Sequence, residues 1–173
     1  MIEQLFAPLP PADISALHAL LRDAVESNAS VGFMLPLTDA EVAAYWHNVL
    51  ATVAAGTRLL FAARDESGRI VGSAQLELAQ KSNARHRGEL QKLLVLRTHR
   101  DRRLGFALMS AAESAARAHG RTLIILDTSA SGNALGLYER CGYTRSGVIP
   151  RYATDPDGTL IATVFYYKEL SPA

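Results

Sequence analysis

The spacing of apolar residues predicts three amphipathic helices. Residues 13–25 carry apolar side chains at helical spacing, and so does a second stretch that begins after Thr38 and stops near Gly56. Thr38 and Glu41 match a capping box, which marks the start of this second helix. A third stretch of the same spacing runs from Leu104 and ends at Gly120.

Short apolar or alternating runs predict strands in most of the remaining chain. They lie at residues 1–7, 58–64, 69–79, 89–96, 123–126 and 159–170. Residues 65–68 have the composition of a hairpin turn, and residues 154–158 form another turn, so that one or two strands close the chain. A short helix is expected at residues 131–141. The order predicts a mixed α/β (α+β) fold whose front half is largely antiparallel.

Composition limits the class of protein. A chain of 173 residues is expected to form a single domain, residues 1–173, and a formal net charge of +1 argues against a dedicated nucleic-acid binder. With Cys141 as its one cysteine, the chain forms no internal disulfide and no thiolate zinc site. The five histidines show no metal-ligand spacing, so no metal is expected. No apolar run is long enough for a membrane span and no signal-peptide layout is present, so we expect a cytoplasmic protein.

Residues 97–103 form an arginine-rich turn between a buried strand and the third helix. They include four arginines and one histidine. A helix N-terminus presents unpaired backbone N–H groups and a positive dipole end, so arginines beside it make an anion site suited to phosphate or pyrophosphate. The alternative is a solvated basic turn on an ordinary strand–helix connection.

Together with LYERCGY at residues 137–143, this strand, turn and helix resemble the GNAT N-acetyltransferase family over about residues 61–170. In that family an R/Q-x-x-G-x-G/A turn wraps the pyrophosphate of acetyl-CoA. The resemblance implies acetyl-CoA as co-substrate, direct transfer in a ternary complex, and a mostly antiparallel sheet flanked by helices and splayed between its fourth and fifth strands.

The turn fits the family motif in two registers. Residues 100–105 keep the first arginine and the last glycine but place Arg103 where the family has its first glycine; residues 102–107 fit literally but need a longer loop. We prefer the first register, because it also places the apolar helix residues correctly. The residues that the resemblance implies for acetyl-CoA binding are Leu94, Val95, Arg100, Arg102, Arg103, Leu104, Gly105, Phe106, Ala107 and Ser131.

Three side chains are candidates for the chemistry of acyl transfer. By resemblance Tyr138 is the general acid for the leaving thiolate, whereas the residue alone also suits a core tyrosine. Glu89 and Asp127 lie on adjacent predicted strands and are candidates for the base that deprotonates the amine. As alternatives, Glu89 is a solvated strand-end charge and Asp127 caps a turn. The family also implies an oxyanion donor among the backbone N–H groups near Leu94 or Val95.

The segments GELQKLLV, LDT and residues 143–170 look like the tabtoxin-resistance subgroup. This narrower resemblance implies a small-molecule amine as acceptor, such as a β-lactam-type toxin or an antibiotic, with the loop at residues 28–37 shaping its site. Family habit implies a monomer or homodimer, with neither nucleic acid nor membrane as a partner. Two alternatives stay open: an acyl-CoA-binding module without turnover, and a protein or peptide N-acetyltransferase.

Overall fold

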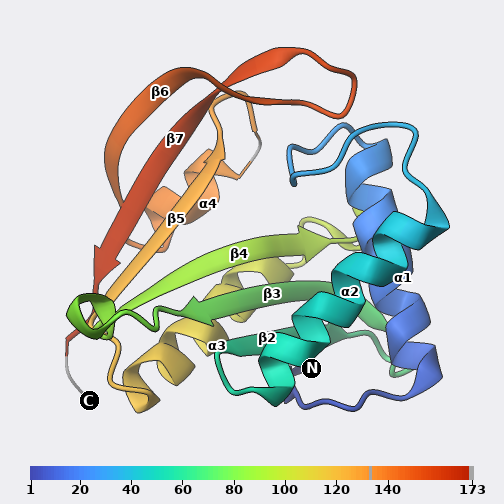
Figure 1. The fold of residues 1–173 in the computed structure, drawn as a ribbon, viewed down its shortest axis with the longest axis horizontal. Helices are drawn as coiled ribbons and strands as arrows, with labels where there is room; N and C mark the ends of the chain where they lie inside the picture. Colours follow the sequence, from blue (N-terminus) through green and yellow to red (C-terminus); the bar gives the residue numbers. More distant parts are fainter. Residues whose placement is uncertain (133, 172–173) are drawn as a thin grey trace.

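The computed structural model describes residues 1–132 and 134–171, which form one seven-stranded sheet with helices on both faces (Figure 1). The elements, in chain order, are β1 (Ile2–Leu5), α1 (Pro11–Glu26), α2 (Asp39–Ala54), β2 (Arg58–Arg64), β3 (Ile70–Leu78), β4 (Arg87–Val95), α3 (Leu104–Ala118), β5 (Leu123–Ser129), α4 (Leu135–Arg140), β6 (Thr144–Thr154) and β7 (Leu160–Glu169). Short 3₁₀ turns lie at Ser82–Ala84 and Arg97–His99. The strand order is β1-β2-β3-β4-β5-β7-β6.

The β4–β5 pair is parallel and the other strand pairs are antiparallel. The predicted mixed α/β fold with a mostly antiparallel sheet is therefore confirmed. The β4–β5 pairing covers only residues 87–89 and 123–125, beyond which the two strands diverge, as Figure 1 shows. We call this divergence the splay. Beyond Glu89 the backbone groups on the β5 side of β4 have no strand partner among the described residues.

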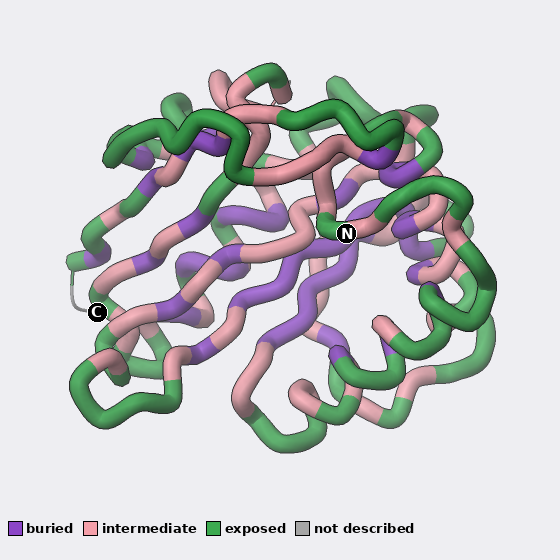
Figure 2. The backbone as a smooth tube through the Cα atoms, turned by 45° about the horizontal axis from the view of Figure 1, so that its top comes forward, coloured by how far each residue is buried: buried purple, intermediate pink, exposed green. Residues whose placement is uncertain are grey.

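Two apolar clusters hold the helices to the sheet. On one face, Leu17 of α1 and Trp46 of α2 are almost fully buried against residues of β2 such as Leu60. On the other face, Leu108 of α3 packs with Ile124 of β5 and the residues around α4. Figure 2 shows the buried residues concentrated in the middle of the sheet and on the inner sides of these helices. The hydrophobic contacts therefore fix the positions of α3 and α4 on one face and of α1 and α2 on the opposite face.

Local signals explain the helix starts. The Thr38 hydroxyl accepts a hydrogen bond from the Glu41 N–H, and the Glu41 carboxylate accepts one from the Thr38 N–H at 2.9 Å, so the capping box is confirmed. Helix α1 begins at Pro11, two residues before the predicted start, because the fixed φ of proline suits the first helical position.

The bounds of β5 and α4 differ from the prediction. Strand β5 continues to Ser129 because β7 pairs with it along residues 123–129, so Asp127 lies within the strand instead of at its end. Helix α4 covers only Leu135–Arg140, because a turn closed by a Gly132 N–H to Ser129 carbonyl bond occupies the start of the predicted helix. Residue 133 of that predicted helix lies outside the described residues. The chain closes with two strands, β6 and β7, of the one or two expected.

Candidate active site

A hydrogen-bonded group of polar side chains covers the α2 side of β2, β3 and β4. Arg58 donates to Gln75 at 2.5 Å, to Gln91 at 3.2 Å and to Glu77 at 2.6 Å. Gln91 in turn donates from Nε2 to Oε1 of Glu89 at 2.8 Å. Gln75 is fully buried and donates to the Tyr45 hydroxyl of α2. We call these five sheet residues, Arg58, Gln75, Glu77, Glu89 and Gln91, the polar face.

Asp127 and Glu89 come together at the splay. Leu90 and Leu126 pack into the α3 cluster, so the alternation of side chains along each strand directs Glu89 and Asp127 to the opposite face. Partial burial raises the pKa of Asp127, the negative charge of Glu89 raises it further, and the ammonium of Lys92 acts in the opposite direction. The two candidate bases are therefore electrostatic neighbours, and the pKa of Asp127 moves toward neutrality.

Lys92 lies at an irregularity of β4. Gln75 pairs with Gln91 and Ser73 with Leu94, so two residues of β4, Lys92 and its successor, face a single residue of β3. Lys92 has a φ of 48°, an uncommon value for a side chain with a Cβ. Such a bulge redirects a side chain, and bulges are frequent beside active sites.

Tyr138 lies on the other face of the sheet, in α4. It is 7% exposed and its ring packs against those of Tyr143 and Tyr166 at centroid distances of 6.3 and 5.8 Å. Burial raises the pKa of Tyr138 to about 12, and a hydrogen bond with Thr128 opposes this shift. Thr128 follows Asp127 on β5, so the Tyr138 hydroxyl lies beside the splay. Because its pKa is about 12, the hydroxyl is protonated at neutral pH.

The hydrogen bonds at the end of β4 distinguish Val95 from Leu94. The N–H of Leu96 donates to the carbonyl of Val71 on β3. Because bonded and non-bonded pairs alternate in an antiparallel ladder, Leu94 also points its backbone groups to β3, whereas Val95 points its own toward β5. The Val95 carbonyl accepts a bond from Arg100 Nε at 3.4 Å. This leaves the Val95 N–H directed into the splay.

The arginine-rich turn leads into an open helix end. Arg103 is the residue before α3 and has a φ of 59°, in the left-handed region that glycine favours. This conformation agrees with the register in which Arg103 occupies the place of the first motif glycine. No side chain in the described part of the chain caps the first turn of α3. The unpaired N–H groups and the exposed side chains of Arg100, Arg102 and Arg103 therefore fit the diphosphate of a coenzyme A molecule.

Helix α3 begins close to α4. A Cβ at Gly105 would lie 3.0 Å from Cδ2 of Leu137, so this glycine permits close packing of the two helices. Of its neighbours, Leu104 and Ala107 are half-buried and Phe106 is 51% exposed. The packing places the open end of α3 next to the helix that carries Tyr138. Ser131 is exposed in the turn after β5, where its hydroxyl lies 3.0 Å from that of Ser129.

The chain matches the model of the "Acetyltransferase (GNAT) family" over residues 17–143. The chain belongs to the GNAT family of acetyltransferases. It therefore carries an acetyl-CoA-dependent N-acetyltransferase domain.

Relatives of known structure agree in fold. A ribosomal-protein-alanine N-acetyltransferase from Brucella melitensis is 24% identical and has a TM-score of 0.82, with 98% of this chain and 99% of that chain covered. A phosphinothricin acetyltransferase from Sinorhizobium meliloti, in complex with acetyl-CoA, is 19% identical with a TM-score of 0.82, with 99% of this chain and 88% of that chain covered.

The catalytic subunit NAA10 of the N-terminal acetyltransferase A complex of Arabidopsis thaliana is a curated relative that is similar in sequence. It is 37% identical over 101 residues, which are 57% of this chain. The chain spans about half the length of this relative, 52%.

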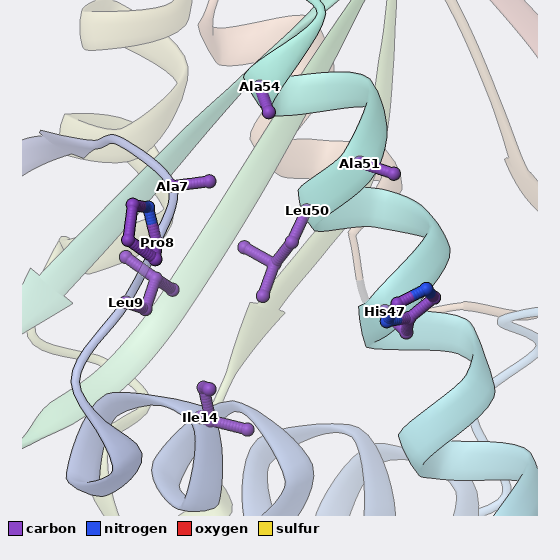
Figure 3. A pocket seen from close by; sticks show the side chains of 8 residues that line it. All are labelled: Ala7, Pro8, Leu9, Ile14, His47, Leu50, Ala51 and Ala54. Atoms are coloured by element: carbon purple, nitrogen blue, oxygen red, sulfur yellow. The ribbon is translucent and has the colours of Figure 1, made fainter.

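Two hollows lie outside the splay of this GNAT domain. Apolar side chains of the segment after β1 and of α1 and α2 face one another in a shallow groove (Figure 3). It is lined by Ala7, Pro8, Leu9, Ile14, His47, Leu50, Ala51 and Ala54. A second hollow, of about 720 Å³, lies beside the β2–β3 turn and includes Arg102 and Leu104. Arg102 is therefore accessible from this side of the turn as well.

Sequence reasoning missed Arg58, Gln91 and Lys92. The alternation of polar residues in β3 was visible, since Gln75 and Glu77 share a strand face with the opposite residues Gln91 and Glu89 of β4. Glu77, the further carboxylate of this face, is held by Arg58 at 2.6 Å. Nothing in the sequence indicates the bulge at Lys92. Among the residues that the structure describes, no group of three His, Cys, Asp or Glu side chains is placed to hold a metal. No described helix is long and apolar enough to cross a membrane.

Proposed function

We propose that this protein transfers an acetyl group from acetyl-CoA to the amine of a small molecule, directly and within a ternary complex. One observation carries the proposal. At the splay, a protonated tyrosine on one face of the sheet lies across from two carboxylates on the other face, and the Val95 N–H points into the space between the strands. These groups match the three requirements of amine acetylation: a base, an oxyanion donor and a group that stabilises the departing sulfur.

The carboxylates prepare the amine. A free alkyl amine is protonated near neutral pH because its pKa is about 10, so it must lose a proton before it attacks. We assign proton removal to Asp127, because its raised pKa makes it a better base than an ordinary aspartate. Glu89, held in place by Gln91, attracts the ammonium form and keeps the pKa of Asp127 high.

Tyr138 acts on the departing sulfur. A phenol with a pKa of about 12 is a weaker acid than a thiol of pKa about 8.5, so complete proton transfer to a thiolate is uphill. We therefore propose that the Tyr138 hydroxyl donates a hydrogen bond to the departing sulfur. The proton stays mainly on the tyrosine oxygen. The Val95 N–H donates to the carbonyl oxygen as negative charge develops there.

The α3 end of the site holds the donor substrate. We assign the diphosphate to the N–H groups of Leu104, Gly105 and Phe106 and to the arginines of the turn. Acetyl-CoA itself supplies an activated thioester. Leu94, Ala107 and Ser131 complete the predicted binding residues, around the end of β4, the first turn of α3 and the turn after β5.

Contacts between two loops favour a small acceptor. The loop of residues 28–37 meets the β6–β7 turn, as Figure 1 shows. The N–H of Leu35 donates to the Pro156 carbonyl at 3.0 Å, and Asn28 donates to Asp157 at 3.2 Å. These bonds join the edge of the α1–α2 side to the far end of the β6–β7 hairpin. A peptide acetylated at its N-terminus needs an open path for the chain that follows, whereas a small amine does not.

Acetylation of a peptide or protein N-terminus is the second candidate function. The similarity to the NAA10 catalytic subunit supports it. The likeness to a phosphinothricin acetyltransferase and the resemblance to the tabtoxin-resistance subgroup support a small amino-acid-like acceptor, a toxin or an antibiotic among them.

We also propose that the protein is cytoplasmic, in keeping with a single, partly buried cysteine. By family habit we propose a monomer or homodimer.

A panel of acceptors distinguishes the candidates. Small amines, amino acids and short peptides are compared at equal concentration with acetyl-CoA, and the release of free thiol is followed. The proposal predicts turnover with at least one small amine and a lower kcat/KM for peptides. A clear preference for peptides would favour N-terminal acetylation, and tight acetyl-CoA binding without turnover of any acceptor would favour a non-catalytic acyl-CoA-binding module.

A further inference from the structure

Lys92 presents a positive charge at the splay that no described residue neutralises by direct contact. Its side chain is half-buried at the bulge of β4, and its Nζ lies 3.8 Å from the position that a Cβ would occupy on Gly32 of the 28–37 loop. No described carboxylate lies within 4.0 Å of Nζ, although Asp127 and Glu89 are close enough to influence its charge. Arg58, the remaining charged neighbour, is bound to Gln75, Gln91 and Glu77.

A half-buried ammonium without a partner is unfavourable, because it loses water without gaining a counter-ion. The backbone at Lys92 also adopts a φ of 48°, which the fold maintains at a cost. The missing counter-ion is supplied if an anion of the acceptor contacts Nζ beside the loop. The nearby carboxylates of Asp127 and Glu89 supply the opposite charge, so the site presents a cation and anions side by side.

We propose that Lys92 binds a carboxylate of the acceptor, so that the acceptor is a small amino acid whose amine faces Asp127 and Glu89. This inference rests on the proposed function and specifies its substrate class. Lys92 touches the acceptor through Nζ and determines specificity; it takes no part in proton transfer. Because Nζ lies beside Gly32, a bound carboxylate would lie next to the 28–37 loop.

The test compares amino acids with their carboxamides. The common L-amino acids and the matching amides, which keep the amine but lose the negative charge, are assayed by thiol release after calorimetry has measured acetyl-CoA binding. For the best pair, the wild-type kcat/KM should favour the acid by about tenfold or more, as a charge-assisted contact predicts. Lys92→Met should remove this preference mainly through KM, and Lys92→Arg should keep part of it.

Lys81→Met is the matched control, since it removes the same charge from an exposed position before the 3₁₀ turn that precedes β4. It should leave the acid-to-amide ratio unchanged. The inference is overturned if wild-type protein treats acids and amides alike, if the preference survives in Lys92→Met, or if acetyl-CoA binds and neither set is acetylated. Failure of acetyl-CoA to bind would instead contradict the proposed function itself.

Discussion

Oε1 of Glu89 accepts a hydrogen bond of 2.8 Å from Nε2 of Gln91. Arg58 of β2 donates to the other end of the Gln91 amide, at 3.2 Å, so a residue two strands away helps to orient a carboxylate at the splay. This arrangement fixes Glu89 beside Asp127. The charge of Glu89 then contributes to the raised pKa of Asp127, which makes the pair sensitive to substitution of either member.

The pH dependence of turnover should report this pair. If Asp127 is the base, kcat/KM falls as the pH falls through the pKa of Asp127, because the protonated carboxyl accepts no proton. Glu89→Gln removes a negative neighbour and therefore lowers the pKa of Asp127. The acidic limb of the profile should shift to lower pH, even if the variant is slower at its optimum.

Glu77→Gln is the control for this shift, because Glu77 shares the polar face but is bound by Arg58. Its acidic limb should stay at the wild-type position. A limb that does not move in Glu89→Gln, or that moves to higher pH, would show that the two carboxylates are not coupled in the way described.

Replacement of Tyr138 by phenylalanine should separate catalysis from binding. The ring packing is kept, but the hydrogen bond to the departing sulfur is lost, so we expect kcat to fall by about 100-fold. The affinity for acetyl-CoA, measured by calorimetry, should change by less than about twofold, because the diphosphate contacts lie at α3. Tyr143→Phe, on a neighbouring buried ring, should retain most of the activity. Equal losses in the two variants would indicate a role in packing alone.

The left-handed residue before α3 should be a site of strain. Arg103→Gly relieves the contact between the Cβ and the backbone at a φ of 59°, so the free energy of unfolding should rise by about 1 kcal/mol. Urea unfolding measures the change. Arg102→Gly is the matched control, since its backbone has no positive φ, and it should not stabilise the protein. Stabilisation by both substitutions, or by neither, would argue against local strain at Arg103.

The contact between the 28–37 loop and the β6–β7 turn should affect the KM for the acceptor amine but not the KM for acetyl-CoA. Asn28 has a φ of 60° and donates to Asp157, so Asn28→Gly removes the bond without adding backbone strain. We expect a higher KM for the small amine and an unchanged KM for acetyl-CoA in steady-state kinetics. A change confined to the KM for acetyl-CoA would show that the Asn28–Asp157 hydrogen bond does not shape the acceptor site.

The sequence predicted the three long helices, the succession of elements along the chain and the mixed α/β class, because the apolar spacing and the capping box at Thr38 are local signals. It predicted neither the bulge at Lys92 nor the network around Arg58, since both depend on which residues of neighbouring strands lie opposite one another. The start of α4 was placed too early for a related reason. The Ser129–Gly132 turn depends on backbone hydrogen bonding that composition does not reveal.

The most direct test of the account is a calorimetric titration of acetyl-CoA into the purified protein, with Arg100→Ala and Arg103→Ala variants alongside the wild type. The account predicts saturable binding to the wild type in the micromolar range, weaker binding to at least one variant, and a further loss when dephospho-CoA replaces the coenzyme. An absence of binding to the wild type would contradict the assignment of the arginine-rich turn and the open end of α3 to the coenzyme.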